Sequence, residues 1–346
     1  MVGEDGASAL RPALLRAPDA GELLLEVRVS GLCGTDLWKL ANGGASAGSV
    51  LGHEIVGNVI EAGAGAAIAA GERVVVPHHV ACGVCALCRR GSETMCDVFR
   101  QNLLEPGGFS ELVLVHERAA RLAARVVPAH LDDEAAVFLE PAACVLRGID
   151  RSGLLLAPPP RTAAVLGGGS MGLLHLLVLR ALDPTLEVLV SDPLPGRRRL
   201  AAALGAARTV DPRAESVADA GRALSSGLGV DAVFDCVGGA AALADGVATL
   251  RPGGSAVLFA HARAGETAGT DLNAFFKHEQ RVIGTYSGGL AEQARIFELL
   301  VNGRLDPSPL VTHRLPLSRF DEGVALCRSL AALKVLFVAG ARGTEP

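Results

Sequence analysis

The chain has 346 residues, which is enough for two domains, because a single domain usually holds about 100–200 residues. Hydrophobic residues make up 50% of it and charged residues 20%, a composition that excludes an intrinsically disordered chain. The net charge of −5 and the aromatic share of 3% provide neither a basic face nor a stacking platform, so we expect no nucleic-acid partner and no membrane partner.

The amino-terminal residues show no targeting signal. Met1 to Leu10 carry Glu4 and Asp5 and lack the basic start and apolar run of a signal peptide. The most apolar stretch, residues 163–182, contains glycines, a histidine and Arg180, which is typical of a buried strand and helix rather than a membrane span. We therefore expect a cytoplasmic protein.

Residues from about 22 to 122 form a β-rich zone interrupted by glycines. Leu23–Val29 and Arg73–Val76 are predicted strands, and the glycine-rich stretch 62–71 is a predicted turn. Two polar motifs lie in this zone, Cys33-Gly34-Thr35-Asp36 and Gly52-His53-Glu54, and Glu140 follows at its end. A cysteine, a histidine and a carboxylate supply three metal ligands and leave a fourth position open, as catalytic zinc requires. On their own, a cysteine and a histidine twenty residues apart are a weak signal.

Four further cysteines follow the pattern C-x2-C-x2-C-x7-C, at Cys82, Cys85, Cys88 and Cys96. Four thiolates within fifteen residues can converge on one tetrahedral zinc ion, at about 2.3 Å each. Such a closed site has no room for a substrate, so we predict a structural zinc in a lobe spanning about residues 78–100. An iron–sulfur cluster and two disulfides are the alternatives that the spacing leaves open.

From about residue 161 to residue 284, short apolar runs alternate with helical stretches such as Met171–Leu182 and Arg197–Leu204. The predicted strands are Thr162–Leu166, Glu187–Ser191, Arg208–Val210, Val230–Phe234, Ser255–Phe259 and Arg281–Ile283. This alternation predicts an α/β fold with a doubly wound, parallel, six-stranded sheet. We assign residues 146–285 to this domain, and residues 1–145 and 286–346 to a β-rich domain that it interrupts.

A glycine-rich loop, Gly167-Gly168-Gly169-Ser170-Met171-Gly172, joins the first of these strands to a helix. Glycines at 167, 169 and 172 let the backbone approach a pyrophosphate, which then lies at the positive end of the helix. Asp192 closes the second strand, twenty residues after Gly172, where a carboxylate accepts ribose hydroxyls and repels a 2′-phosphate. We therefore expect NAD as the cofactor, with NADP less favoured.

Together these motifs resemble the zinc-dependent medium-chain dehydrogenase/reductase family of the alcohol dehydrogenase superfamily. Gly52–Gly57 followed by Gly63 is similar to the zinc signature of that family, and the four-cysteine segment is similar to its structural zinc loop. Residues 71–75 and 107–111 and the pair Glu140-Pro141 also match, so the likeness covers nearly the whole chain. The pair of carboxylates is most similar to the sorbitol and threonine dehydrogenase branches.

The resemblance implies a GroES-like catalytic domain, a Rossmann NAD-binding domain, two zinc ions per chain and a homodimer or homotetramer. By that resemblance Cys33 and His53 are ligands of the catalytic zinc. Either Glu54 or Glu140 is the third, and the other binds through water or exchanges during turnover. Asp36 then fixes the tautomer of His53.

The resemblance also assigns Thr35 to the proton relay and places Arg197 near the adenosine ribose, beside Asp192. Trp38 stands where many relatives have the histidine that ends the relay, so that step cannot run through the same group. Lys39 is either a substitute for it or a solvated surface residue. Only Lys39, Lys277 and Lys334 are lysines, which leaves few candidates for a lysine base. The other histidines have no metal partner that we can assign: His78, His79, His116, His130, His175, His261, His278 and His313.

The residues and the resemblance together imply NAD-dependent oxidation of a secondary alcohol, namely a polyol, sugar alcohol or cyclitol. The alternatives are threonine dehydrogenase-like oxidation of an amino alcohol, and a simple alcohol dehydrogenase or ketone reductase. A nucleotide-binding protein that has lost catalysis is a further possibility, but the joint presence of Cys33, Thr35, His53, Glu54 and Glu140 opposes it. Zinc content discriminates between these classes, because the enzyme needs two ions and the decayed site only one.

Overall fold

A computed structural model describes residue 1 and residues 9–339 of the chain. Residues 2–8, which hold Glu4 and Asp5, and residues 340–346 lie outside the described residues. The chain divides into two compact units, one of Met1–Pro141 with Gly289–Pro346 and one of Ala142–Gly288. Among the described residues, no helix is both long enough and apolar enough to span a membrane.

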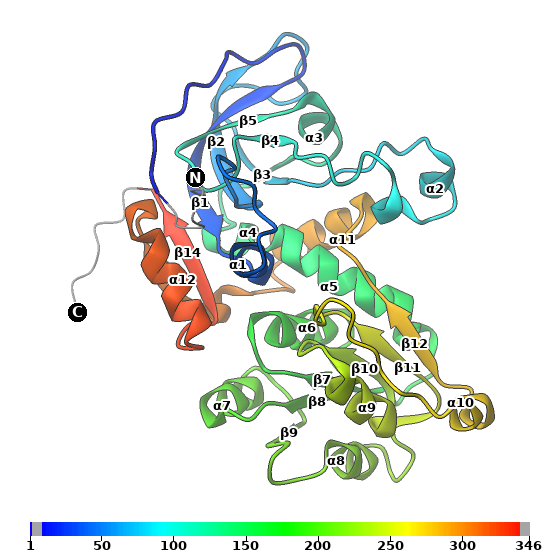
Figure 1. Ribbon diagram of the computed structural model, residues 1–346. Coiled ribbons are helices and arrows are strands. Elements are labelled where there is room, and N and C mark those ends of the chain that lie inside the picture. The colour runs from blue at the N-terminus through cyan, green and yellow to red at the C-terminus, as the bar shows by residue number, and fades with distance from the viewer. Residues whose placement is uncertain (2–8, 340–346) are drawn as a thin grey trace. The chain divides into compact units, whose positions relative to one another are not determined.

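An eight-stranded sheet forms the centre of the first unit (Figure 1). Its strands are β1 (Leu23–Gly31), β2 (Glu54–Ala62), β3 (Arg73–Pro77), β4 (Leu104–Glu105), β5 (Leu112–Val115), β6 (Arg125–Val126), β13 (Val311–Leu315) and β14 (Lys334–Val338). The main path runs β13-β14-β1-β2-β3-β6, and β5 pairs with both β1 and β4. Alternate residues of β1, such as Leu23, Leu25 and Val27, enter the core beside Ile55 and Val74.

The helices of this unit are short. They are α1 (Gly34–Ala41), α2 (Ala86–Arg89), α3 (Glu117–Leu122), α4 (Asp133–Ala136), α11 (Leu290–Val301) and α12 (Phe320–Arg328), with 3₁₀ turns at Glu93–Met95, Ser308–Leu310 and Leu317–Arg319. The carboxyl-terminal strand β14 lies next to β1, with Gly31 opposite Leu336, while Gly31 also faces Glu54 across the β1–β2 pair. Chain segments nearly 300 residues apart therefore meet around Gly31.

The second unit holds a six-stranded parallel sheet with the order β12-β11-β10-β7-β8-β9. Strands β7 (Thr162–Leu166), β8 (Glu187–Ser191) and β9 (Arg208–Val210) coincide with the predicted ranges, and β10 (Val230–Asp235) and β12 (Arg281–Gly284) are one residue longer. The strand order reverses between β7 and β10, the point at which doubly wound sheets bind ligands. The predicted α/β class is confirmed.

Helices α6 (Ser170–Leu182), α7 (Pro195–Ala203), α8 (Val217–Leu224), α9 (Ala240–Thr249) and α10 (Leu272–His278) connect these strands. Helix α5 (Leu139–Ser152) and a 3₁₀ turn (Leu154–Leu156) precede them. One boundary prediction is wrong, because β11 spans Leu250–Leu258 and therefore begins five residues before the predicted strand Ser255–Phe259. Val230 pairs with Leu250 but Ala232 pairs with Ser255, so a bulge accommodates the extra residues within the strand.

Candidate metal and dinucleotide sites

Cys33, His53 and Glu54 form a three-ligand group, in which one ligand atom of each residue lies within 4.8 Å of the others. Cys33 is the N-cap of α1, and its Sγ accepts a hydrogen bond from the Thr35 N–H at 3.5 Å. His53 and Glu54 stand at the start of β2, so the strand pairing of β1 and β2 brings the two segments together. Thr35 lies in the first turn of α1, two residues after Cys33.

Asp36 orients this group. Its carboxylate is fully buried, and Oδ1 lies 3.4 Å from His53 Nδ1, which leaves Nε2 of that ring for a metal. The same carboxylate accepts hydrogen bonds from the backbone N–H of Cys33 at 3.1 Å and of Gly52 at 3.4 Å. Burial raises the pKa of Asp36, but His53 and these donors together lower it more, so its pKa lies below the ordinary value.

Lys334 is a residue of this site that our sequence analysis did not assign. Its Nζ donates a hydrogen bond to Glu54 Oε2, and the side chains of both residues are buried. It also lies over the Phe138 ring, at 5.3 Å from the centroid. Burial lowers the pKa of Lys334, and Glu54 with other nearby groups raises it more, so its pKa lies above the ordinary value. The sequence feature that could have revealed this residue is a lysine at the start of the apolar segment Lys334–Val338, in a chain that has three lysines.

Glu54 Oε1 shows that the group fits a metal. This oxygen is buried, and no described residue gives it a hydrogen bond. An unpartnered buried carboxylate oxygen is costly, and a cation beside a thiolate and an imidazole satisfies it. Position 31 must be glycine for this carboxylate to fit, because a Cβ there would lie 2.0 Å from Glu54 Oε2. Glu140 lies in the first turn of α5, and the three-ligand group found among the described residues does not include it.

The four-cysteine group also fits a metal. The sulfur of Cys82 lies 3.9 Å from that of Cys88 and 3.6 Å from that of Cys96, and Cys85 and Cys88 are 3.5 Å apart. Sulfurs at about 2.3 Å from a tetrahedral zinc are about 3.8 Å from one another, so these separations suit one ion. The backbone N–H groups of Val84 and Cys85 lower the pKa of Cys82 to about 6, whereas burial and the neighbouring thiols raise that of Cys88 to about 12.

His78 and His79 lie beside the three-ligand group, although no sequence motif assigns them a role. Glu54 faces Pro77 across the β2–β3 pair, and continuing that register sets His53 opposite His78. The ring centroids of His53 and His78 are 4.6 Å apart, and those of His78 and His79 are 3.5 Å apart. Only the register of the two strands reveals this proximity.

In the second unit, the glycine-rich loop has the backbone that a dinucleotide site needs. Gly167 has a φ of +93°, and a Cβ at Gly172 would lie 1.7 Å from the Gly167 carbonyl oxygen, so neither position tolerates a side chain. Gly169 is the N-cap of α6, and Met171 lies in the first turn of that helix. The first N–H groups of a helix lack intrahelical partners, so the start of α6 is suited to an anion.

Asp192 follows β8 and is only 3% exposed. Its Oδ2 accepts a hydrogen bond from the Gly168 N–H at 2.8 Å, and its Oδ1 accepts one from the Leu194 N–H at 2.7 Å. Asp192 therefore links the glycine-rich loop to the loop that follows β8. Arg197 Nη1 lies 3.6 Å from Asp192 Oδ2, and Arg198 pairs with Asp211 at 3.1 Å. Arg197 and Arg198, the arginines near Asp192, are therefore each paired with a carboxylate.

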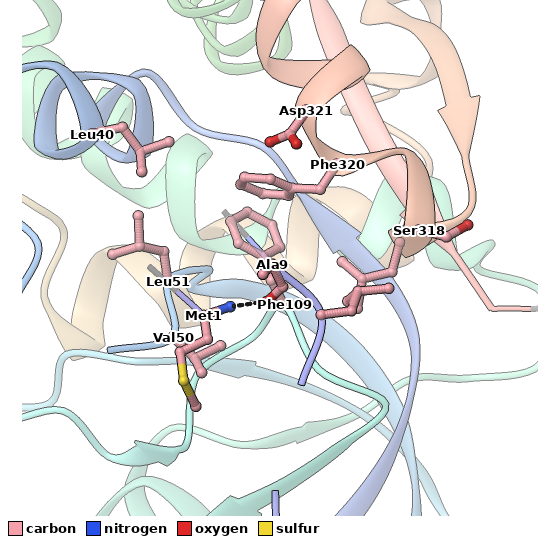
Figure 2. A pocket seen from close by; sticks show the side chains of 11 residues that line it. Met1, Ala9, Leu40, Val50, Leu51, Phe109, Ser318, Phe320 and Asp321 are labelled. Atoms are coloured by element: carbon pink, nitrogen blue, oxygen red, sulfur yellow. Dashed lines mark hydrogen bonds between the residues drawn. The ribbon is translucent and has the colours of Figure 1, made fainter. Parts of the chain in front are cut away.

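An apolar pocket of about 100 Å³ in the first unit is separate from these groups. Figure 2 shows Phe109 and Phe320, whose ring centroids are 5.0 Å apart, together with Leu51 and other apolar side chains. The amino group of Met1 donates a hydrogen bond to the Ala9 carbonyl oxygen at its rim. None of Cys33, His53 and Glu54 is among the residues that line it.

Comparison with known proteins identifies the family. The model of the alcohol dehydrogenase GroES-like domain matches residues 19–125, and that of the zinc-binding dehydrogenase matches residues 170–302. An L-threonine 3-dehydrogenase from Pyrococcus abyssi is 30% identical over 332 residues, covering 93% of this chain and 92% of the relative. The chain belongs to the zinc-dependent medium-chain dehydrogenase family. The predicted family, fold class and oxidoreductase function are thereby confirmed.

Two further relatives of this dehydrogenase are informative. An L-galactonate-5-dehydrogenase from Escherichia coli is 29% identical over 310 residues, covering 88% of this chain and 87% of the relative. The crystal structure of a putative zinc-binding dehydrogenase from Sinorhizobium meliloti 1021, bound to NADP, is 30% identical with a TM-score of 0.87 and covers 97% of both chains. The family thus extends over both units of this dehydrogenase.

Proposed function

We propose that this dehydrogenase oxidises a secondary alcohol, namely a polyol, sugar alcohol or cyclitol, and that it uses NAD as the hydride acceptor. The observation that carries the proposal is the three-ligand group, in which Glu54 presents a buried, unpartnered oxygen beside Cys33 and His53. Three protein ligands leave one tetrahedral position for the substrate oxygen. The four-cysteine group would hold a second, structural zinc ion.

When bound, zinc lowers the pKa of a substrate hydroxyl as a Lewis acid, and NAD accepts the hydride of the carbinol carbon. Asp36 holds Nδ1 of His53 and so directs Nε2 to the metal position. Lys334 retains Oε2 of Glu54, which leaves Oε1 as the ligand atom. In this proposal Thr35 Oγ1 receives the hydroxyl proton and passes it toward solvent, and Glu140 is the carboxylate that acts through water or by exchange.

The preference for NAD follows from the charges around Asp192. A 2′-phosphate there would face a buried carboxylate, and Arg198 is already paired with Asp211. We expect Asp192→Asn, which removes the charge but retains an acceptor oxygen, to raise the ratio of kcat/KM for NADP to that for NAD by about tenfold or more. Steady-state kinetics with both cofactors measure this ratio, and the exposed Asp219→Asn on α8 is the matched control. An unchanged ratio, or a wild-type enzyme that prefers NADP, contradicts the assignment.

We also propose a homodimer or homotetramer in the cytoplasm. Strand β12 is an edge of the six-stranded sheet, and the nearby Leu272 and Phe276 of α10 are 78% and 81% exposed. Such apolar exposure next to a free strand edge favours a contact between subunits. None of the eight cysteines forms a disulfide, which suits a reducing compartment.

A substrate panel tests the proposed reaction. The zinc-loaded enzyme is given NAD with a linear sugar alcohol, a cyclitol, L-threonine or a simple secondary alcohol, and NADH formation is followed by its absorbance. We expect kcat/KM for the best polyhydroxylated substrate to exceed that for the simple alcohol by about tenfold or more, because buried polar groups of a site discriminate strongly between such substrates. A highest value with L-threonine supports the amino-alcohol alternative instead, and equal values for all alcohols contradict selection of a polyol.

A further inference from the structure

The rings of His53, His78, His79 and Phe99 form a row that leads from the three-ligand group to the four-cysteine group of the first unit. The ring centroids are 4.6 Å apart for His53 and His78, 3.5 Å for His78 and His79, and 5.2 Å for His79 and Phe99. Phe99 is 1% exposed and forms a small core with Ala81 and Cys96, against which Cys82, Cys85 and Cys88 pack. We call these four rings the ring column. It begins at a ligand of the three-ligand group and ends in the core of the four-cysteine lobe.

The local chain geometry explains how this column forms. His78 follows the last residue of β3, in register with His53 at the start of β2. Cross-strand neighbours of this kind have side chains close enough to pack. The chain then passes through Val80 and Ala81, each 1% exposed, and reaches Cys82 three residues after His79. The segment that supplies the first zinc ligand of the lobe therefore also supplies the two central rings.

The central rings are held by packing. Nδ1 of His78 is buried, and no described residue gives it a hydrogen bond. The position of the His78 ring consequently depends on the His53 and His79 rings packed against it. A displacement of one ring is passed to the next, since closely packed interiors transmit displacements.

We propose that the ring column couples the two metal groups: zinc in the four-cysteine lobe fixes Phe99, and through His79 and His78 this sets the His53 ring for the catalytic metal. His78 and His79 are then positioning residues, because neither belongs to the three-ligand group. The inference rests on the proposed function, in that it requires metal at both groups.

A double-mutant cycle tests this coupling. Enzyme is prepared with zinc in the four-cysteine group and Co²⁺ in the three-ligand group, where the visible spectrum of Co²⁺ reports ligand geometry and its titration gives affinity. We expect Cys85→Ser, which removes the lobe zinc, and His79→Leu, which interrupts the column, each to weaken Co²⁺ binding about tenfold and to shift the spectrum. The double variant should be no weaker than either single variant. Additive losses, or an unaltered Co²⁺ site in Cys85→Ser that has lost its lobe zinc, overturn the proposal.

Two further variants keep the test decisive. His79→Phe retains a ring in the column and should bind Co²⁺ like the wild type, so equal losses for His79→Phe and His79→Leu contradict the proposal even if Cys85→Ser fails to fold. His175→Leu is the matched control, because His175 is fully buried against Phe234 and Phe259 in the second unit. Failure of the proposed function would look different: Cys33→Ser would then leave the Co²⁺ spectrum of the enzyme unchanged.

Discussion

Cys33→Ser should lower kcat by about a thousandfold or more and leave one zinc ion per chain in place of two. The thiolate is one of the three protein ligands that we propose, whereas a serine hydroxyl stays protonated and binds zinc poorly. A thousandfold loss corresponds to about 4 kcal/mol, the size of effect that a Lewis-acid metal provides. Steady-state kinetics and elemental zinc analysis measure both quantities.

The same variant should retain NADH binding, because the glycine-rich loop and Asp192 belong to the second unit. Cys327→Ser on α12 is the matched control, since Cys327 lies outside both cysteine-containing metal groups, and it should keep full activity and both zinc ions. A Cys33→Ser enzyme with wild-type kcat would refute the assignment of the catalytic metal.

Lys334→Met should reduce the free energy of unfolding by about 3–5 kcal/mol. The substitution leaves Glu54 as a buried carboxylate without its ion-pair partner, and uncompensated buried charges carry a penalty of this size. Denaturant titration measures the loss. Lys277→Met at the exposed carboxyl-terminal end of α10 is the matched control and should change the stability by less than about 0.5 kcal/mol.

The origin of that loss can be separated from simple misfit of methionine. Combining Lys334→Met with Glu54→Gln removes both charges, so the double variant should recover part of the stability lost in Lys334→Met. An equal free energy of unfolding for Lys334→Met and Lys277→Met would contradict a stabilising role for the buried ion pair between Lys334 and Glu54.

The sequence was most informative where local pattern determines structure. Strands β7 and β8 lie inside the parallel sheet and read as short apolar runs, which is why their predicted ranges coincide with the structure. The start of β11 could not be read in the same way. Its bulge depends on the pairing of Val230 with Leu250, and the sequence Pro252-Gly253-Gly254 at the bulge is typical of a turn.

The candidate site also combines residues that a local motif reveals with residues that only long-range strand pairing brings together. Motif spacing and family resemblance brought out Cys33, His53 and Glu54, and the structure sets Asp36 beside His53 as the resemblance implied. Lys334 could not be found in this way, because it reaches Glu54 from a strand 280 residues away. His78 was equally hidden, since its position opposite His53 depends on the register of two strands.

Removal and return of one zinc ion is the most direct test of the central claim, that the group formed by Cys33, His53 and Glu54 holds the catalytic metal. The enzyme is treated with a chelator until only the four-cysteine zinc remains, and NADH formation from its best alcohol substrate is measured before and after zinc is restored. We predict no NADH formation by the one-zinc enzyme and full recovery when a second zinc ion binds. A one-zinc enzyme that reduces NAD at the full rate would contradict the claim.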